Sequence, residues 1–178
     1  MAKLEWKSLD DNPNLVSDSA LHAYKELNNK NVLVAEIDPA FMNGMQFCEQ
    51  YEVDPSDGAN CVIVEAVRGE NKTYVAVVVP VGQKADLNGK VKKYLDVKRV
   101  SFANLDKVIE ETGMEYGSIT PFGLPNNYKV LIDSKIMNKE YLIIGGGKQI
   151  SKIRVPTMIF KELKNIEVIE NLSNAVLK

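Results

Sequence analysis

Two neighbouring stretches rich in valine and isoleucine, residues 60–67 and 74–81, constrain the fold of this chain more than any other feature. Branched side chains favour extended backbone, and the Arg-Gly-Glu-Asn sequence at 68–71 favours a turn, so the stretches are predicted to pair as an antiparallel hairpin. Residues 77–79 are three consecutive valines. We therefore expect the second strand to be covered on both faces, as in the middle of a mixed sheet flanked by helices.

The rest of the chain alternates between helical and extended patterns. Capping residues and apolar residues at helical spacing predict helices over 17–29, 39–51, 86–95, 104–112 and 157–163. Strands are predicted over 32–37, 129–133, 141–144 and 152–155, and a short helix or strand over 166–178. With 178 residues, 45% of them hydrophobic, we expect an α/β fold in a single domain, residues 1–178, with a mixed, partly antiparallel central sheet surrounded by helices.

The composition argues against several classes of function. The net charge of −2 gives no overall attraction to nucleic acid, so any RNA contact needs a local basic patch. Two cysteines, Cys48 and Cys61, and one histidine, His22, are too few for a disulfide framework or a typical metal centre, and no cofactor is expected. No apolar run approaches ~18 residues and no signal-peptide pattern opens the chain, so we expect a cytoplasmic protein without membrane or DNA partners.

One stretch, residues 84–99, is basic although the chain as a whole is slightly acidic. It contains only two acidic residues, Asp86 and Asp96, and six basic ones: Lys84, Lys90, Lys92, Lys93, Lys98 and Arg99. Such a run is often a solvated helix face. It is also the one stretch suited to RNA phosphates.

The segment 112–125 contains an unusual concentration of glycine and proline. Gly117, Pro121, Gly123 and Pro125 follow Gly113, which suits a helix C-terminus. Glycine lets the backbone approach a ligand closely, and free N–H groups in such a loop can meet a carbonyl or an oxyanion. The segment is either an ordinary connection from helix to strand or a shaped binding loop.

The order of motifs around this loop favours the second interpretation. The run 117–121, Gly-Ser-Ile-Thr-Pro, resembles the GxxxP loop of the YbaK/ProX family of freestanding aminoacyl-tRNA deacylases, which includes the editing domain of bacterial prolyl-tRNA synthetases. Residues 98–103 and the helix 104–112 precede the loop in family order. Phe-Gly-Leu at 122–124, the strand ending in Leu-Ile-Asp at 131–133 and the glycines before Lys148 follow it. The similarity covers roughly residues 15–165 and is strongest over 98–148.

The resemblance implies trans-editing, the hydrolysis of the ester bond of a mischarged aminoacyl-tRNA. The partners would be the aminoacylated end of a tRNA and, as a second candidate, an aminoacyl-tRNA synthetase. The implied carbonyl-facing loop contains Gly117, Ser118 and Pro121, and the floor contains Asn60 and Cys61. The implied substrate-binding walls contain Phe41, Met42, Met45, Phe122, Gly145, Gly146, Gly147 and Lys148. The implied phosphate contacts are Lys90, Lys92, Lys93, Lys98 and Arg99.

The chain departs from the family pattern at two positions. Cys61 stands where many members carry a lysine, and Lys152 stands where some carry an aspartate, so the charge of the wall is reversed. Three explanations are open. Hydrolysis can proceed by substrate assistance from the vicinal hydroxyl of the terminal adenosine; Cys61 can act as a nucleophile, which needs a depressed pKa; or the fold can bind its ligand without catalysis.

Overall fold

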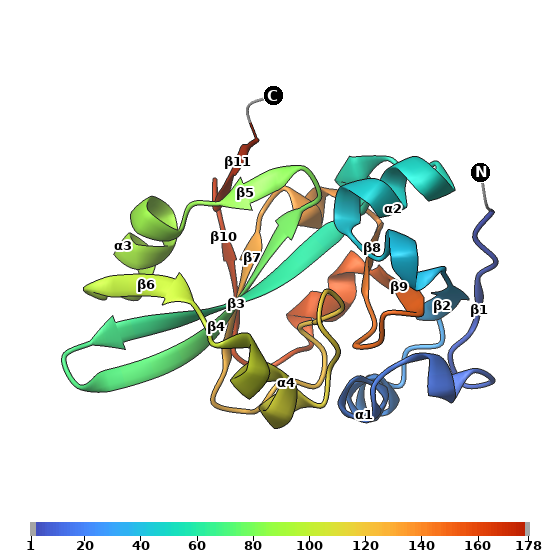
Figure 1. The fold of residues 1–178 in the computed structure, drawn as a ribbon, viewed down its shortest axis with the longest axis horizontal. Coiled ribbons are helices and arrows are strands. Elements are labelled where there is room, and N and C mark those ends of the chain that lie inside the picture. The colour runs from blue at the N-terminus through green and yellow to red at the C-terminus, as the bar shows by residue number, and fades with distance from the viewer. Residues whose placement is uncertain (1–2, 177–178) are drawn as a thin grey trace.

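The predicted hairpin forms the middle of a five-stranded sheet (Figure 1). The structure is a computed structural model that describes residues 3–176. Strand β3 (Ala59–Arg68) pairs antiparallel with β4 (Asn71–Pro80) and, on its other side, with β6 (Arg99–Phe102). Strand β4 pairs in parallel with β7 (Lys129–Asp133), as β7 does with β10 (Ile166–Ile169).

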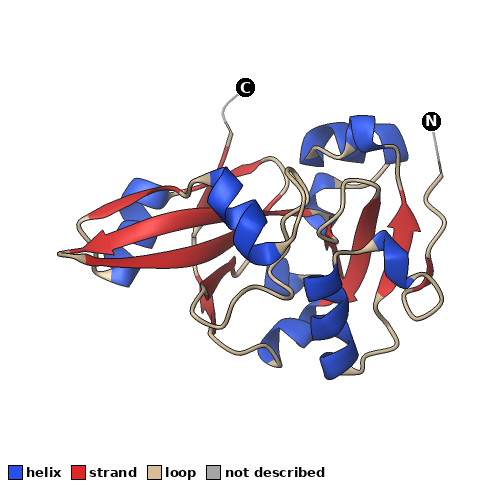
Figure 2. Ribbon diagram, turned by 60° about the horizontal axis from the view of Figure 1, so that its bottom comes forward, coloured by secondary structure: helices blue, strands red, loops and turns tan. Residues whose placement is uncertain are grey.

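A second sheet, of four antiparallel strands, lies beside the first (Figure 2). Its strands, in spatial order, are β1 (Lys7–Ser8), β2 (Leu33–Glu36), β9 (Ser151–Pro156) and β8 (Tyr141–Gly145). A small antiparallel pair joins β5 (Gln83–Ala85) to β11 (Ser173–Ala175). The prediction of a mixed, partly antiparallel sheet is therefore confirmed for the five-stranded sheet, but the strands are divided among three sheets.

Both faces of β4 are buried, as its three consecutive valines predicted. Val78 packs into a core cluster shared with the four-stranded sheet, whereas Val77 and Val79 pack on the other side. That side is covered by Val91 of the helical segment before β6 and by Leu172 near the C-terminal end. Because successive side chains of β4 point to opposite faces, this strand contributes to the hydrophobic clusters on both sides of the five-stranded sheet.

Four α-helices flank the sheets: α1 (Asp18–Leu27), α2 (Gly44–Tyr51), α3 (Lys92–Leu95) and α4 (Leu105–Thr112). The Ser17 side chain accepts a hydrogen bond from the Ala20 N–H at the start of α1. Asn104 caps α4 in the same way, and Gly113 ends it in the left-handed conformation with φ of 66°. These two helices are confirmed, as is Gly113 as the residue that ends α4; the cap at Asn104 was not predicted.

Three predicted helices differ in detail. The helix expected over 39–51 is wrong as a continuous element: a 3-10 turn (Pro39–Phe41) is followed by a break at Asn43, whose ψ is 136°, before α2 begins. The segment 86–95 begins as a π-helical turn (Leu87–Val91) because both carboxylate oxygens of Asp86 accept backbone N–H groups one turn ahead. Residues Thr157–Lys161 form a 3-10 helix.

No helix within residues 3–176 is long and apolar enough to cross a membrane.

Candidate active site

A cavity of about 500 Å³ lies where β3, the start of α2, the β6–α4 junction and the loop 112–125 meet. Strand β3 supplies one side with Ala59, Asn60, Cys61, Val62 and Ile63. The other lining residues are Asn43, Gly44, Phe102, Ala103, Leu105, Val108, Tyr116, Gly117, Ile119, Gly145 and Lys152. The lining is mostly apolar with a few polar groups, which is usual for small-molecule sites.

The glycine–proline loop is fixed to the glycine turn after β8. The N–H of Glu115 donates to the carbonyl of Gly147 at 2.8 Å, and the N–H of Gly147 donates to the carbonyl of Ser118 at 2.8 Å. A Cβ atom at Gly145 would lie 2.8 Å from the Ser118 carbonyl oxygen, so glycine is required for this approach. The loop and the turn therefore form one wall.

Several backbone donors of this wall are free. Within residues 3–176, the N–H groups of Tyr116, Gly117 and Ile119 have no protein acceptor, and all three residues line the cavity. Gly117 has φ of 74°, and a Cβ atom there would lie 3.0 Å from the Met42 side chain. Glycine thus provides both the conformation and the space that this position needs.

Cys61 lines the cavity as a half-buried thiol. Burial raises its pKa to about 12. The nucleophile hypothesis requires the opposite shift, produced by a nearby cation or base. Cys61 is therefore a neutral thiol at physiological pH.

Lys152 is the cationic side chain of the lining. It extends from β9, opposite Gly145 of β8, and is only 5% exposed. Its Nζ donates to the Met42 carbonyl at 2.8 Å and lies 5.2 Å from the centre of the Phe47 ring. Burial lowers its pKa to about 8, partly offset by the Cys48 thiol, so the ammonium form predominates at pH 7.

The structure brings together some of the predicted site residues. Asn60, Cys61, Gly117 and Gly145 all line the cavity. Met42 does not line it, but its side chain packs against Gly117 and its carbonyl accepts a hydrogen bond from Lys152. These residues come from four separate segments of the chain.

Other predicted residues lie outside the cavity. Ser118 is buried, and Phe122 is in the core, with its ring centre 4.7 Å from that of Tyr24. Pro121 lines a different groove, beside α1. The remaining ones are the half-buried Phe41, the exposed Met45, the buried glycines Gly146 and Gly147, and Lys148, whose Nζ donates to the Asn14 carbonyl at 2.7 Å.

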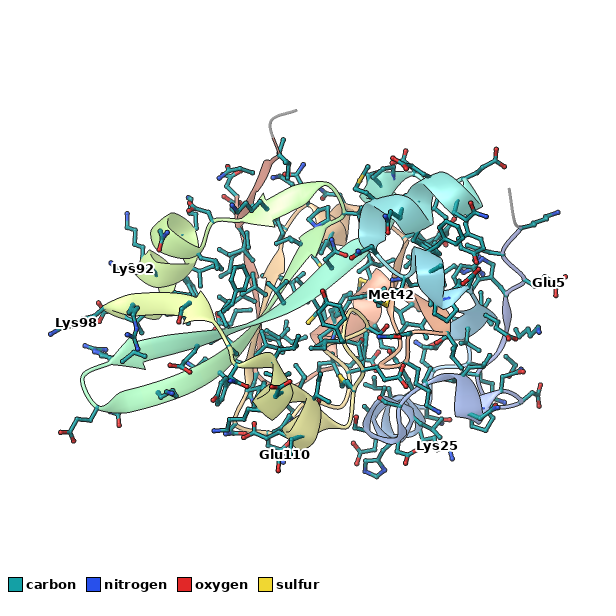
Figure 3. The ribbon with its side chains drawn as sticks, viewed as in Figure 1. Glu5, Lys25, Met42, Lys92, Lys98 and Glu110 are labelled. Atoms are coloured by element: carbon teal, nitrogen blue, oxygen red, sulfur yellow. The ribbon has the colours of Figure 1, made fainter. Side chains whose placement is uncertain are left out.

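The predicted phosphate contacts lie at one end of the molecule. Figure 3 shows Lys92 and Lys98 beside α3 and β6, well away from Met42. Lys90, Lys93, Lys98 and Arg99 are exposed, and Arg99 lies 3.9 Å from the Glu65 carboxylate. Strand β6 runs from this basic end to the cavity, where Phe102 is part of the lining.

Two aromatic residues of the lining were not predicted. Phe102 is 68% exposed and Tyr116 is 57% exposed, so both present ring surface to solvent at the cavity. Their positions in the sequence could have indicated them. Phe102 lies two residues before the helix predicted over 104–112, and Tyr116 lies directly before Gly117 in the glycine–proline loop.

Comparisons with known proteins bear on this geometry. Residues 39–162, more than two thirds of the chain, match the family described as the aminoacyl-tRNA editing domain. Hypothetical protein APE2540 has a similar structure, with a TM-score of 0.76 and 19% identity over 88% of this chain and 100% of that one. A protein proposed to be a trans-editing enzyme for prolyl tRNA synthetase has a TM-score of 0.70 and 16% identity, over 87% of this chain and 97% of that one. At these identities, the likeness to solved structures establishes the fold.

Proposed function

Because the chain belongs to the aminoacyl-tRNA editing domain family, we propose that it hydrolyses the ester of a mischarged aminoacyl-tRNA in trans. The observation that carries this proposal is the group of free N–H donors at Tyr116, Gly117 and Ile119, all on residues that line the cavity. The oxygen of an ester carbonyl becomes negative as water adds to the carbon. Backbone donors already held in position stabilise that charge without reorganising.

The attacking water needs a base, and the cavity wall does not supply a suitable one. Its lining residues, all in the described part of the chain, include no aspartate, glutamate or histidine. Cys61 is held neutral by its raised pKa, and Lys152 is mostly protonated at pH 7. This supports the route that the family resemblance implies, in which the vicinal hydroxyl of the terminal ribose relays the proton of the water.

The bond changes are those of ordinary ester hydrolysis. The water oxygen bonds to the carbonyl carbon, and the bond from that carbon to the ribose oxygen breaks. The proton from the water is passed to the departing ribose oxygen. The products are a free amino acid and a tRNA whose terminal hydroxyl is restored.

The surroundings of the cavity suit an RNA 3′ end. Phe102 and Tyr116 offer exposed rings on which an unpaired base can stack, a contact worth about 1–3 kcal/mol per base. The basic cluster at the far end of β6 lies along the same edge of the sheet and can receive phosphates.

The direct test is deacylation by the purified protein. A panel of tRNAs charged with alanine, serine, threonine, cysteine, aspartate or glutamate is incubated with the protein, and the released amino acid is compared with release in buffer. We expect at least one acyl group to be released faster than in buffer. If a broad panel shows no release but the tRNAs bind, a ligand-binding role without catalysis replaces the proposal.

A matched pair of glycine variants tests the wall. Gly117→Ala and Gly69→Ala both place a side chain at a positive φ, 74° and 62°, so the backbone strain is similar. A Cβ atom at Gly69 meets nothing within 4 Å, whereas one at Gly117 meets Met42 beside the cavity. Gly117→Ala should lower kcat/KM by about 10²-fold, and Gly69→Ala should retain activity. Equal losses would show that strain alone is responsible.

A further inference from the structure

The Lys152 ammonium is buried in the cavity wall without a charged partner. Within residues 3–176, no carboxylate oxygen lies within 4.0 Å of its Nζ. Lysines this buried are usually paired, because removing a charge from water is costly. The wall therefore contains a cation that the protein itself does not neutralise.

The hydrogen bonding of this ammonium is also incomplete. An ammonium has three N–H donors, and the Nζ of Lys152 has a single protein acceptor among the described residues, the Met42 carbonyl. The face of the Phe47 ring, 5.2 Å away, provides a further favourable but undirected contact. Two donors remain for a ligand.

The rest of the cavity offers no compensating negative charge. The lining contains neither aspartate nor glutamate, although the chain has 24 acidic residues. The fixed charge of the lining at pH 7 is therefore the single positive charge of Lys152. A ligand side chain that carries a negative charge is favoured there, whereas the α-amino group is common to all aminoacyl esters and does not distinguish them.

We propose that Lys152 binds the side-chain carboxylate of the acyl group, so that the cavity selects acidic aminoacyl esters, aspartyl or glutamyl, over their uncharged counterparts. This proposal rests on the proposed function, because it specifies the acyl group that the same cavity accepts. An aspartyl and an asparaginyl group have nearly the same size and shape. Discrimination between them depends on charge and not on fit.

The experiment compares acyl groups on one RNA. A short RNA hairpin ending in CCA is charged with aspartate, asparagine, glutamate or glutamine, and kcat/KM is measured for each. We expect each acidic ester to be hydrolysed at least tenfold faster than its amide counterpart by the wild-type protein. Lys152→Met should abolish this ratio, and Lys152→Gln, which keeps a polar side chain, should abolish it as well.

Lys135→Met is the matched control. Lys135 also donates from its Nζ to a backbone carbonyl, that of Ser173 at 2.8 Å, but it is away from the cavity and lies 3.9 Å from the Asp133 carboxylate. The variant removes the same charge from the protein and should keep the acidic preference. A lower rate on all four esters in Lys152→Met, with an unchanged ratio, would overturn the proposal, since it would mean that Lys152 acts on the common ester or on the fold.

Binding of free amino acids separates this inference from the proposed function. Free aspartate should raise the melting temperature of the wild-type protein more than free asparagine does, and Lys152→Met should remove the difference. If no ester is hydrolysed but this difference is seen, the binding of a side-chain carboxylate by Lys152 stands and the proposed function fails. If esters are hydrolysed without an acidic preference, the inference fails and the proposed function stands. An equal effect of aspartate and asparagine, with protection by inorganic phosphate, would assign Lys152 to a phosphate group and overturn the inference.

Discussion

Replacement of Lys152 by methionine should make the protein more stable at pH 7. Methionine keeps an unbranched chain of similar length but removes the buried charge. Burial lowers the pKa of Lys152 from 10.5 to about 8, which corresponds to about 3 kcal/mol at ~1.4 kcal/mol per pH unit. Loss of the hydrogen bond to the Met42 carbonyl subtracts about 1 kcal/mol, so the net expected gain in the free energy of unfolding is about 2 kcal/mol.

The gain should depend on pH in a defined direction. Below pH 8 both the folded and the unfolded state carry the protonated lysine, so the full cost of burial is present. Between pH 8 and 10.5 the unfolded state binds more protons than the folded one, and the wild type becomes more stable relative to the variant as pH rises. Above this window the advantage of Lys152→Met should have disappeared.

Urea denaturation of both proteins at pH 7 and pH 10 measures this difference. The difference between the free energies of unfolding of the two proteins, taken at each pH, removes most of the effects of titratable groups that both proteins contain. The Cys48 thiol, whose own pKa burial raises to about 11, is the titratable neighbour that acts on Lys152 and should be replaced by alanine in both proteins as a check. A variant that is less stable than wild type at pH 7, or an advantage that is the same at both pH values, would refute the reasoning.

Three further changes test the site. In single-turnover deacylation, Cys61→Ser should react at a rate within about threefold of wild type. A loss of ~10³-fold would instead support a covalent mechanism at Cys61. Lys93→Glu combined with Lys98→Glu should weaken tRNA binding and flatten its dependence on salt concentration without changing the circular dichroism spectrum; an unchanged slope would assign both lysines to solvated surface. Phe102→Ala should weaken binding of a CCA-ended RNA by about 1–3 kcal/mol in a fluorescence titration and leave binding of a duplex without an overhang unchanged.

The fold could be anticipated where local chemistry and burial point the same way. The consecutive valines of β4 required cover on both faces, and the structure provides it. The cap at Ser17 was also visible in the sequence, because its side chain satisfies an N–H group only a few residues away. The break at Asn43 was not visible, since it places Gly44 against the Asn60 side chain, which comes from a distant strand.

The site was harder to anticipate because its character depends on packing between distant segments. Strand β9 alternates so that Ser151 and Ile153 share one face, and by this pattern alone Lys152 would be exposed on the other; only the family resemblance placed it on the wall. The Phe47 ring of α2 covers that second face, and the lysine becomes buried. Phe122 shows the converse error: a loop aromatic expected at the substrate instead fills the core against Tyr24 and Phe160.

The hydrogen bonds that join Glu115 and Ser118 to Gly147 limit how a substrate can enter. A loop tethered in this way cannot swing open by itself, because it would have to separate from the β8–β9 turn and leave the buried peptide groups of Ser118 and Gly147 without partners. Entry and exit must then occur beside the exposed rings of Phe102 and Tyr116, with the backbone of the loop stationary. The amides of Glu115 and Gly147 should accordingly exchange with solvent deuterium slowly and at a common rate, whether or not an acyl group is bound.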